Sequence, residues 1–266
     1  MKRPKVSVVM SVFNGALWVD EAIESIAKQS VRDWEFIIID DGSTDETPQI
    51  LAKWAANDSR IRVFTTANQG LTRALNRALE LTKGSYIARQ DADDRSYPTR
   101  LERQTDFLDR HPDVVLLGTG AKLLGEKRTP FRTAIQPAHD VDIARKMQKQ
   151  NAFFHSSVMM RGAAIRQAGG YDPDFVRAQD YELWFRLMEQ GKAANLSEAL
   201  IDLYQGDDRI SRTAARAQVT AALRAKIKNR RGRVLKGTAP HRFFWQLRGY
   251  LIPPGTLDRF RARQRR

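Results

Sequence analysis

The sequence predicts an α/β protein whose core is a doubly wound, mostly parallel β-sheet flanked by helices, with a basic helical extension at the C-terminal end. Two observations predict the sheet. Short apolar, β-branched runs alternate with helical patterns, and clusters of Asp follow two of those runs. A third observation, a change from balanced to basic composition near residue 205, separates a body over residues 1–205 from an extension over residues 206–266.

The first 110 residues alternate four buried strands with four helices. Each expected strand is an apolar run, most of them rich in Val and Ile, and the strands span 5–12, 34–40, 61–66 and 85–90. Each is followed by apolar residues at helical spacing, and these helices span 17–30, 46–57, 70–82 and 99–110. Since ligands bind beyond the carboxyl ends of the strands in such sheets, the segments after the strands form the candidate site.

The rest of the body contains shorter elements. A strand over 114–119 leads into a glycine-punctuated stretch, and residues 126–138, with Pro130 and Pro137, are typical of a polar loop. The further elements are a helix over 139–149, a strand over 156–160, a short helix over 161–168 and a helix over 180–190. No segment repeats another, so we expect one sheet-based body.

Composition excludes several kinds of protein. The absence of cysteine excludes disulfides, thiolate metal sites and a cysteine nucleophile. No apolar run approaches the roughly 20 residues that a membrane-spanning helix needs. The first four residues, Met1-Lys2-Arg3-Pro4, lead directly into a strand without the apolar region of a signal peptide. We therefore expect a cytoplasmic protein.

The positive charge is concentrated at the C-terminal end. Residues 1–204 hold 28 Lys and Arg against 28 Asp and Glu, whereas residues 205–266 hold 17 against 3. The net charge of +14 therefore belongs to the extension, so the functions of the basic extension and of the neutral body have to be inferred separately.

Three carboxylates, Asp91, Asp93 and Asp94, follow the fourth strand almost without spacing. Carboxylates this close repel one another unless a cation or hydrogen bonds intervene. A hard divalent ion such as Mg²⁺ resolves the repulsion, because it typically takes one or two carboxylates together with substrate phosphates. The pattern is thus consistent with a metal that bridges the protein to a nucleotide diphosphate, or with a solvated acidic turn.

Further carboxylates stand at two other junctions. Asp40 and Asp41 close the second strand, where they could accept hydrogen bonds from a base or a ribose, or form a turn with a helix cap at Thr44 or Asp45. Asp180 opens a helix, so it is either a cap favoured by the helix dipole or a general base for an attacking hydroxyl. The lone histidines His111 and His155 have no metal-ligand partners at useful spacing and are interpreted as structural or acceptor-side residues.

Taken together, these segments resemble the family 2 glycosyltransferases, the bacterial inverting enzymes of the GT-A fold. The matching segments occur in the expected order: VSVVMSVFNG (6–15), IIIDDGSTDET (37–47), NQGLTRALN (68–76), YIARQDADD (86–94), PTRLERQTDFL (98–108), GGYD (169–172) and QDYELWFRL (179–187). The resemblance covers about residues 5–205. It implies that this stretch is the glycosyltransferase domain.

The resemblance implies a role for each matching residue. The nucleotide wall comprises Ser11, Val12, Phe13, Asn14, Asp40 and Asp41. Asp91 and Asp93 match the D-x-D motif that holds Mg²⁺ or Mn²⁺ against the diphosphate of the donor, with Asp94 as an extra contact. Asp180 matches the catalytic base, although Gln179 stands where the family usually has Glu. Many members have an arginine at the position of Leu75, and here Arg73 or Arg89 would supply that cation at the nucleotide.

The resemblance also bears on the reaction. The family's processive synthases have a Q-x-x-R-W motif and membrane-spanning helices, and neither occurs in this sequence. We expect a single-addition, inverting enzyme that moves a sugar from a nucleotide-diphosphate donor, a UDP-sugar by family analogy, to a glycan or lipid-linked acceptor. The expected pathway is surface polysaccharide or lipopolysaccharide biosynthesis.

The basic extension predicts a membrane partner. Residues 209–236 are typical of a basic helix, and residues 241–255 interleave aromatic and aliphatic side chains with arginine. Such a segment suits an anionic membrane interface, so we expect a peripheral position at the inner face of the cell membrane. The alternative is that the aromatic side chains pack back on the body.

Three other function classes could explain parts of the sequence. A nucleic-acid binder would explain the pI of 10.3, but the body is neutral and no nucleic-acid motif occurs. A nucleotidyltransferase would usually have a glycine-rich phosphate loop near the first strand, and Phe13-Asn14-Gly15 is not one. An inactive scaffold is disfavoured because every acidic position of the pattern is filled.

Overall fold

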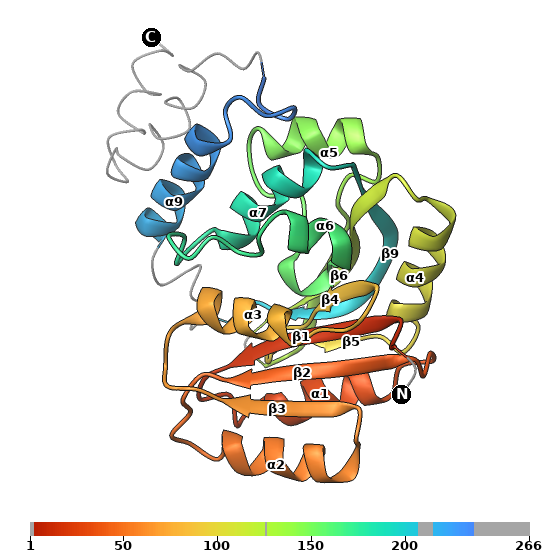
Figure 1. Ribbon diagram of the computed structural model, residues 1–266, viewed down its shortest axis with the longest axis vertical. Coiled ribbons are helices and arrows are strands. Elements are labelled where there is room, and N and C mark those ends of the chain that lie inside the picture. The colour runs from red at the N-terminus through yellow and green to blue at the C-terminus, as the bar shows by residue number, and fades with distance from the viewer. Residues whose placement is uncertain (1–2, 126, 207–214, 237–266) are drawn as a thin grey trace.

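Four apolar runs form the parallel half of the sheet in the computed structural model, which describes residues 3–125, 127–206 and 215–236. Strands β1 (Val6–Val12), β2 (Trp34–Asp40), β3 (Ile61–Thr65) and β4 (Tyr86–Arg89) lie in the order β3-β2-β1-β4 (Figure 1). β2 and β4 are buried along their whole length, since helices cover both faces of the sheet, which explains their continuous apolar sequences.

The other half of the sheet is mixed. β4 pairs antiparallel with β8 (Met159–Arg161), β8 pairs antiparallel with β6 (Val114–Leu124), and β6 runs parallel to β9 (Lys192–Tyr204). β5 (Arg95–Ser96) pairs with β9, and β7 (Pro130–Ala134) pairs with β6. Among the described residues the sheet has nine strands, in the order β3-β2-β1-β4-β8-β6-β9-β5 with β7 beside β6. The predicted α/β fold class is confirmed.

Helices cover both faces of this sheet. Their bounds are α1 (Val19–Ala27), α2 (Thr47–Asn57), α3 (Leu71–Glu80), α4 (Arg100–Arg110), α5 (Asp140–Met147), α6 (Gly162–Gln167), α7 (Gln179–Met188) and α9 (Ala215–Lys228). Alternate side chains of β2 point to opposite faces. Phe36 and Ile38 join the cluster beneath α1, α2 and α4, whereas Ile37 and Ile39 join the cluster beneath α3, α5, α6 and α7.

Two predictions for the second half of the body are corrected by the structure. The polar loop predicted over residues 126–138 contains β7, an almost fully exposed strand that pairs with β6. An exposed strand shows no apolar alternation, so its sequence does not reveal it. Strand β9 has no counterpart among the predicted elements. Polar residues such as Asn195 and Glu198 interrupt its apolar pattern, and its register with β6 is irregular.

Other predicted elements differ at their ends. The strand predicted over 114–119 continues to Leu124 because β7 and β9 both pair with its second half. The strand predicted over 156–160 begins instead as a short 3₁₀ helix, His155–Ser157, and β8 starts at Met159.

The C-terminal part of the described chain packs on the body. The helix predicted over 209–236 ends at Lys228, after which the chain continues in turns, and its residues 209–214 lie outside the described part of the chain. Ala225, Val234 and Leu235 are buried and belong to the same apolar cluster as α7. The aromatic segment 241–255 lies outside the described residues. No helix in the described part of the chain is long and apolar enough to cross a bilayer.

Candidate active site

The strand register brings the predicted site residues to one edge of the sheet. Val12 at the end of β1 lies opposite Asp40 at the end of β2, and β4 lies on the other side of β1 with Arg89 opposite Val9. The loops that follow these three strands therefore start side by side, at the carboxyl ends of parallel strands (Figure 1).

The first two loops hold each other through side-chain hydrogen bonds. Asn14, at a positive φ of 49°, accepts a bond from the N–H of Thr44 at 2.8 Å. Asp40 is fully buried, and its Oδ1 accepts a bond from the N–H of Ser43 at 3.0 Å. Its Oδ2 is buried and has no hydrogen-bond partner within the described chain. A buried acceptor without a partner is costly, so this oxygen suits a donor group on a ligand.

The neighbouring wall is formed by the end of β1. Ser11 is half-buried, Val12 is buried, and the ring of Phe13 is 51% exposed. Phe13 follows Val12, the partner of Asp40 in the sheet, so these strand ends offer an exposed aromatic residue for stacking and an unpartnered acceptor, which suit a nucleobase.

Asp41 accepts hydrogen bonds from the main chain of the protein itself. Its carboxylate accepts from the N–H groups of Gln69 at 2.9 Å and of Gly70 at 2.8 Å, immediately before α3. Arg73 on α3 is exposed and lines a cavity of about 530 Å³ together with Thr66 and Gln69. Asp41 thus fixes the start of α3, and its contact with a nucleotide stays a prediction.

Arg89 holds the first carboxylate of the acidic loop. This arginine is only 1% exposed, and its guanidinium forms an ion pair with Asp91 and donates to the carbonyl of Val9 at 3.3 Å. The N–H of Asp91 donates to Ser156 Oγ at 3.2 Å, so the loop is also fixed to the 3₁₀ helix. Arg89 therefore orients Asp91, and its predicted contact with a nucleotide stays a prediction.

The other two carboxylates of the loop differ in burial. Asp94 is buried and accepts a bond from the N–H of Tyr204 at 2.9 Å, which ties the loop to β9. Asp93 is half-buried, and its carbonyl accepts a bond from Arg128 at 2.7 Å. The Arg128 guanidinium lies 4.4 Å from the ring centroid of Trp18. Sequence reasoning missed Arg128, because its partners are distant in the sequence.

Asp180 lies in the first turn of α7. The residue before this helix, Ala178, adopts a left-handed conformation with φ 53°, and no side chain caps the helix there. The carboxylate of Asp180 accepts a hydrogen bond from Asn151 Nδ2 at 2.7 Å. Asn151 is a second residue that sequence reasoning missed, since nothing in the spacing of these residues indicates that they meet.

A buried tyrosine, Tyr171, contacts the 3₁₀ helix to which the acidic loop is fixed. His155 Nε2 is 2.9 Å from the hydroxyl oxygen of Tyr171. Burial raises the pKa of Tyr171, Arg89 opposes the rise, and Asp180 and Asp91 add to it. The Tyr171 hydroxyl therefore keeps its proton at neutral pH and can donate it to His155.

The acidic loop by itself provides few metal ligands. In the described ranges, no three His, Asp or Glu side chains converge on one point. Asp91 and Asp93 are the partly exposed carboxylates of the loop, and Mg²⁺ commonly binds through one or two carboxylates while substrate phosphates and water complete its shell. The donor set therefore fits a divalent ion that arrives with a phosphorylated ligand.

Comparison with known proteins agrees with this geometry. The model of glycosyl transferase family 2 matches residues 7–168. The putative glycosyltransferase EpsE of Bacillus subtilis is 38% identical over 214 residues, which cover 79% of this chain and 76% of EpsE. The O-antigen biosynthesis glycosyltransferase WbnJ of Escherichia coli is 33% identical, covering 74% of this chain and 78% of WbnJ.

Solved structures share the fold at lower identity. Residues 1–349 of S. aureus TarS in complex with UDP-GlcNAc superpose with a TM-score of 0.70 at 18% identity, over 93% of this chain and 71% of that one. The mannosyltransferase PcManGT of Pyrobaculum calidifontis, in complex with GDP-Man and Mn²⁺, gives 0.67 at 20% identity, over 91% and 68%. The family match, the relatives and the fold agree, and the chain is a member of glycosyltransferase family 2.

Proposed function

We propose that this protein is an inverting glycosyltransferase that moves a sugar from a nucleotide-diphosphate donor to a hydroxyl of a glycan or lipid-linked acceptor. The observation that carries the proposal lies at the strand ends, where Asp40 has a buried oxygen without a partner in the described chain and Asp91 and Asp93 are partly exposed. Asp180, which Asn151 orients, would add the acceptor-side carboxylate that such a transfer needs.

The nucleoside would bind at the ends of β1 and β2. The unpartnered Oδ2 of Asp40 would accept a hydrogen bond from the base or the ribose, with Phe13 and Asn14 beside it. Arg73 and the cavity that it lines lie next to this position. The complexes of TarS with UDP and UDP-GlcNAc support a UDP-sugar as the donor. PcManGT is in complex with GDP-Man, so the preference for uracil over guanine is to be measured with both donors.

Asp91 and Asp93 would hold Mg²⁺ or Mn²⁺ at the diphosphate. When bound, the ion would stabilise the negative charge that develops on the leaving nucleoside diphosphate. Arg89 would keep Asp91 oriented from the buried side. Ser156 and Arg128 would fix the main chain of the loop on either side of these carboxylates.

Asp180 would take the proton of the acceptor hydroxyl. Asn151 orients its carboxylate through one oxygen, and the second oxygen would accept the proton as the hydroxyl attacks the anomeric carbon. The C1–oxygen bond to the diphosphate breaks as the new glycosidic bond forms, so one displacement inverts the configuration. No covalent nucleophile is required, which is consistent with a chain without cysteine.

The names of the relatives suggest a pathway. WbnJ is named for O-antigen biosynthesis and AmsE of Erwinia amylovora for amylovoran biosynthesis. We therefore assign the acceptor to cell-surface polysaccharide or lipopolysaccharide biosynthesis. The nucleotidyltransferase, nucleic-acid-binding and scaffold alternatives are not favoured. The family model matches residues 7–168, which include Asp40, Asp91 and Asp93.

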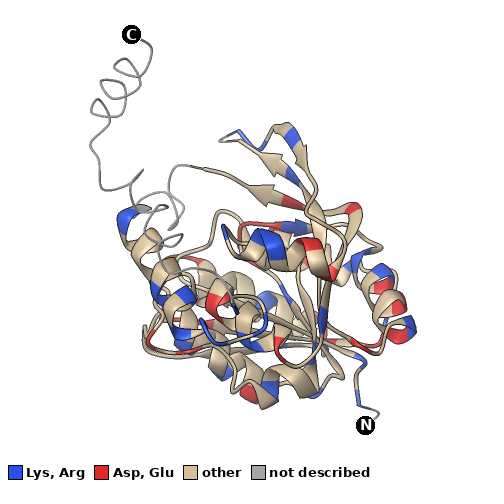
Figure 2. Cartoon of the chain, turned by 90° about the horizontal axis from the view of Figure 1, so that it is seen from above, with Lys and Arg blue, Asp and Glu red and all other residues tan. Residues whose placement is uncertain are grey.

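The proposal keeps a role for the basic extension. The exposed side chains of Arg216 and Arg224 lie on α9, a helix that carries several basic residues (Figure 2). Each basic side chain near an anionic leaflet contributes about 1 kcal/mol to binding. A peripheral position at the cytoplasmic face of the membrane would bring the site to a lipid-linked acceptor.

Two substitutions test the proposal by separating donor binding from transfer. Asp93→Asn should remove most of the Mn²⁺-dependent rise in melting temperature that a UDP-sugar produces, because a ligand that binds the folded state stabilises it. Asp180→Asn should keep this rise but lose transfer by about 10²–10⁴-fold, the usual worth of a general base. Transfer at the wild-type rate in Asp180→Asn would remove Asp180 from the role of base.

A further inference from the structure

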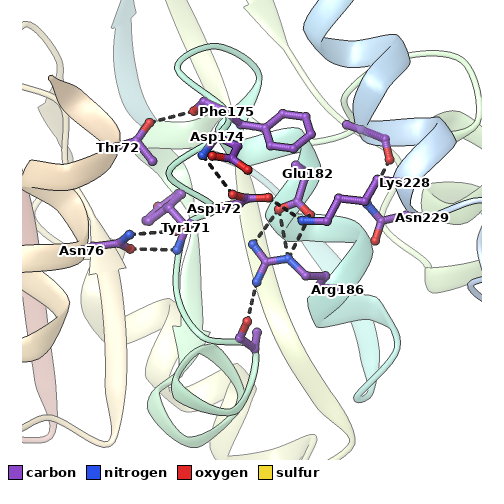
Figure 3. A network of polar contacts seen from close by, with 12 residues as sticks. Thr72, Asn76, Tyr171, Asp172, Asp174, Phe175, Glu182, Arg186, Lys228 and Asn229 are labelled. Carbon is purple, nitrogen blue, oxygen red and sulfur yellow. Dashed lines mark hydrogen bonds and ion pairs between the residues drawn. The ribbon is translucent and has the colours of Figure 1, made fainter.

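Helix α9 contacts the segment that carries Asp180 on both sides of that residue. Lys228 Nζ forms ion pairs with Asp172, which precedes Asp180, and with Glu182 at 2.9 Å, which follows it (Figure 3). One ammonium group from the C-terminal helix therefore joins the two ends of the segment 172–182. The family model ends at residue 168 and the resemblance at about residue 205, so α9 lies beyond both.

The carboxylate at the far end of the segment depends on its cations. The side chain of Glu182 has no exposed surface. Arg186, one turn further along α7, binds both of its oxygens and also donates to the carbonyl of Ala168 (Figure 3). A buried carboxylate is tolerated only when charges and hydrogen bonds compensate its desolvation, and Lys228 is the second cation that does so.

The segment between these anchors contains a strained residue. Ala178, buried just before α7, adopts the left-handed conformation, which is unfavourable for an alanine. Such a conformation persists only where the surroundings over-determine it. Helix α3 holds one side of the segment, since Thr72 donates to the carbonyl of Phe175 at 2.8 Å and Asn76 binds both main-chain groups of Tyr171 (Figure 3). Helix α9 holds the other side.

A second lysine of α9 contacts the partner of Asp180. Lys226 is 3% exposed, and its Nζ donates to the carbonyl of Lys149 at 3.1 Å. Lys149 stands two residues before Asn151, whose amide binds Asp180. Thus α9 fixes both the helix that carries the carboxylate and the loop that orients it.

From these contacts we propose that α9 positions Asp180 for proton transfer and that Lys228 is the positioning residue. The inference rests on the proposed role of Asp180 as the base. It assigns a function in transfer to a helix outside the matched family region. Because Lys228 acts through Asp172 and Glu182, its loss should displace Asp180 without touching the strand ends that would bind the donor.

The test compares Lys228→Met with Arg230→Met, a matched loss of one positive side chain from the surface just beyond α9. Arg230 donates to the nearby carbonyl of Ile227, and its side chain is exposed. Lys228→Met should lower kcat by about tenfold or more, since small misplacements of a catalytic group are costly, and leave KM for the donor within twofold. Lys228→Arg should restore most of kcat, and Arg230→Met should match the wild type.

Hydrogen–deuterium exchange gives a readout that does not depend on activity. Amide exchange over residues 171–180 should rise in Lys228→Met and in Asp172→Asn, but not in Arg230→Met. An unchanged kcat in Lys228→Met overturns the inference, whether or not exchange rises. So does a loss of kcat that is matched by a loss of donor affinity and of melting temperature, because that pattern indicates general destabilisation.

The two proposals fail in different ways. If Asp180→Asn abolishes transfer while Lys228→Met behaves like the wild type, the positioning inference fails and the proposed function stands. If Asp180→Asn transfers at the wild-type rate, the base assignment fails and the positioning inference fails with it.

Discussion

At the scale of single residues, Arg100 has the strongest predicted effect on stability. It is completely buried behind the acidic loop, and burial together with Arg89 lowers its pKa to about 9. Its guanidinium donates to five acceptors: Gln104 Oε1, Gln90 Oε1, Ser96 Oγ and the carbonyls of Arg89 and Val158. Arg100→Met leaves these acceptors without their donor, so we expect a loss of about 3–5 kcal/mol in the free energy of unfolding in urea.

The matched control for Arg100 stands on the same helix. Arg103 is an exposed residue of α4 whose guanidinium pairs with the exposed Glu198. Exposed pairs contribute about 0–1 kcal/mol, so Arg103→Met should change the urea midpoint little. Equal midpoints for Arg100→Met and Arg103→Met would show that the buried network does not stabilise the loop.

At the scale of elements, helix α9 places the buried ammonium group of Lys226 in the protein interior. Burial lowers the pKa of Lys226 from 10.5 to about 8. Between these values the unfolded chain binds more protons than the folded protein, so the stability of the wild type relative to Lys226→Met should rise with pH. This gain in the free energy of unfolding should begin near pH 8 and approach its full value near pH 10.5. At about 1.36 kcal/mol for each pKa unit, it should amount to at most about 3 kcal/mol. Urea unfolding of both proteins from pH 7 to 10 measures it, and a pH-independent difference would contradict a lowered pKa.

At the scale of the whole molecule, the chain after residue 205 is expected to be needed for stability. Ala225, Val234 and Leu235 complete the apolar cluster around α7, and each buried Val or Leu side chain contributes about 1.5–3 kcal/mol. A chain that ends at residue 205 should therefore unfold at a clearly lower urea concentration than one that ends at residue 236. If both unfold at the same concentration, residues 1–205 form a self-sufficient unit and the packing of α9 adds nothing.

The sequence by itself determined the first half of the fold and the edge of the sheet at which the acidic residues gather. The strands from β1 to β4 and the helices between them follow from local apolar periodicity, because parallel strands buried on both faces have continuous apolar sequences. The edge at which Asp40, Asp91 and Asp93 gather follows from the same pattern, since parallel strands end together.

Only the tertiary structure decided how the second half of the sheet and the segment around Asp180 are built. β7 and β9 owe their conformation to pairing with β6, and the bonds from Asn151 to Asp180 and from Lys228 to Glu182 join segments far apart in the sequence. The physical reason is that local sequence fixes backbone preference and the side that an apolar residue faces. Which buried charges meet depends instead on how the elements pack. That packing makes Asp41 and Asp94 accept hydrogen bonds from main-chain N–H groups of distant segments.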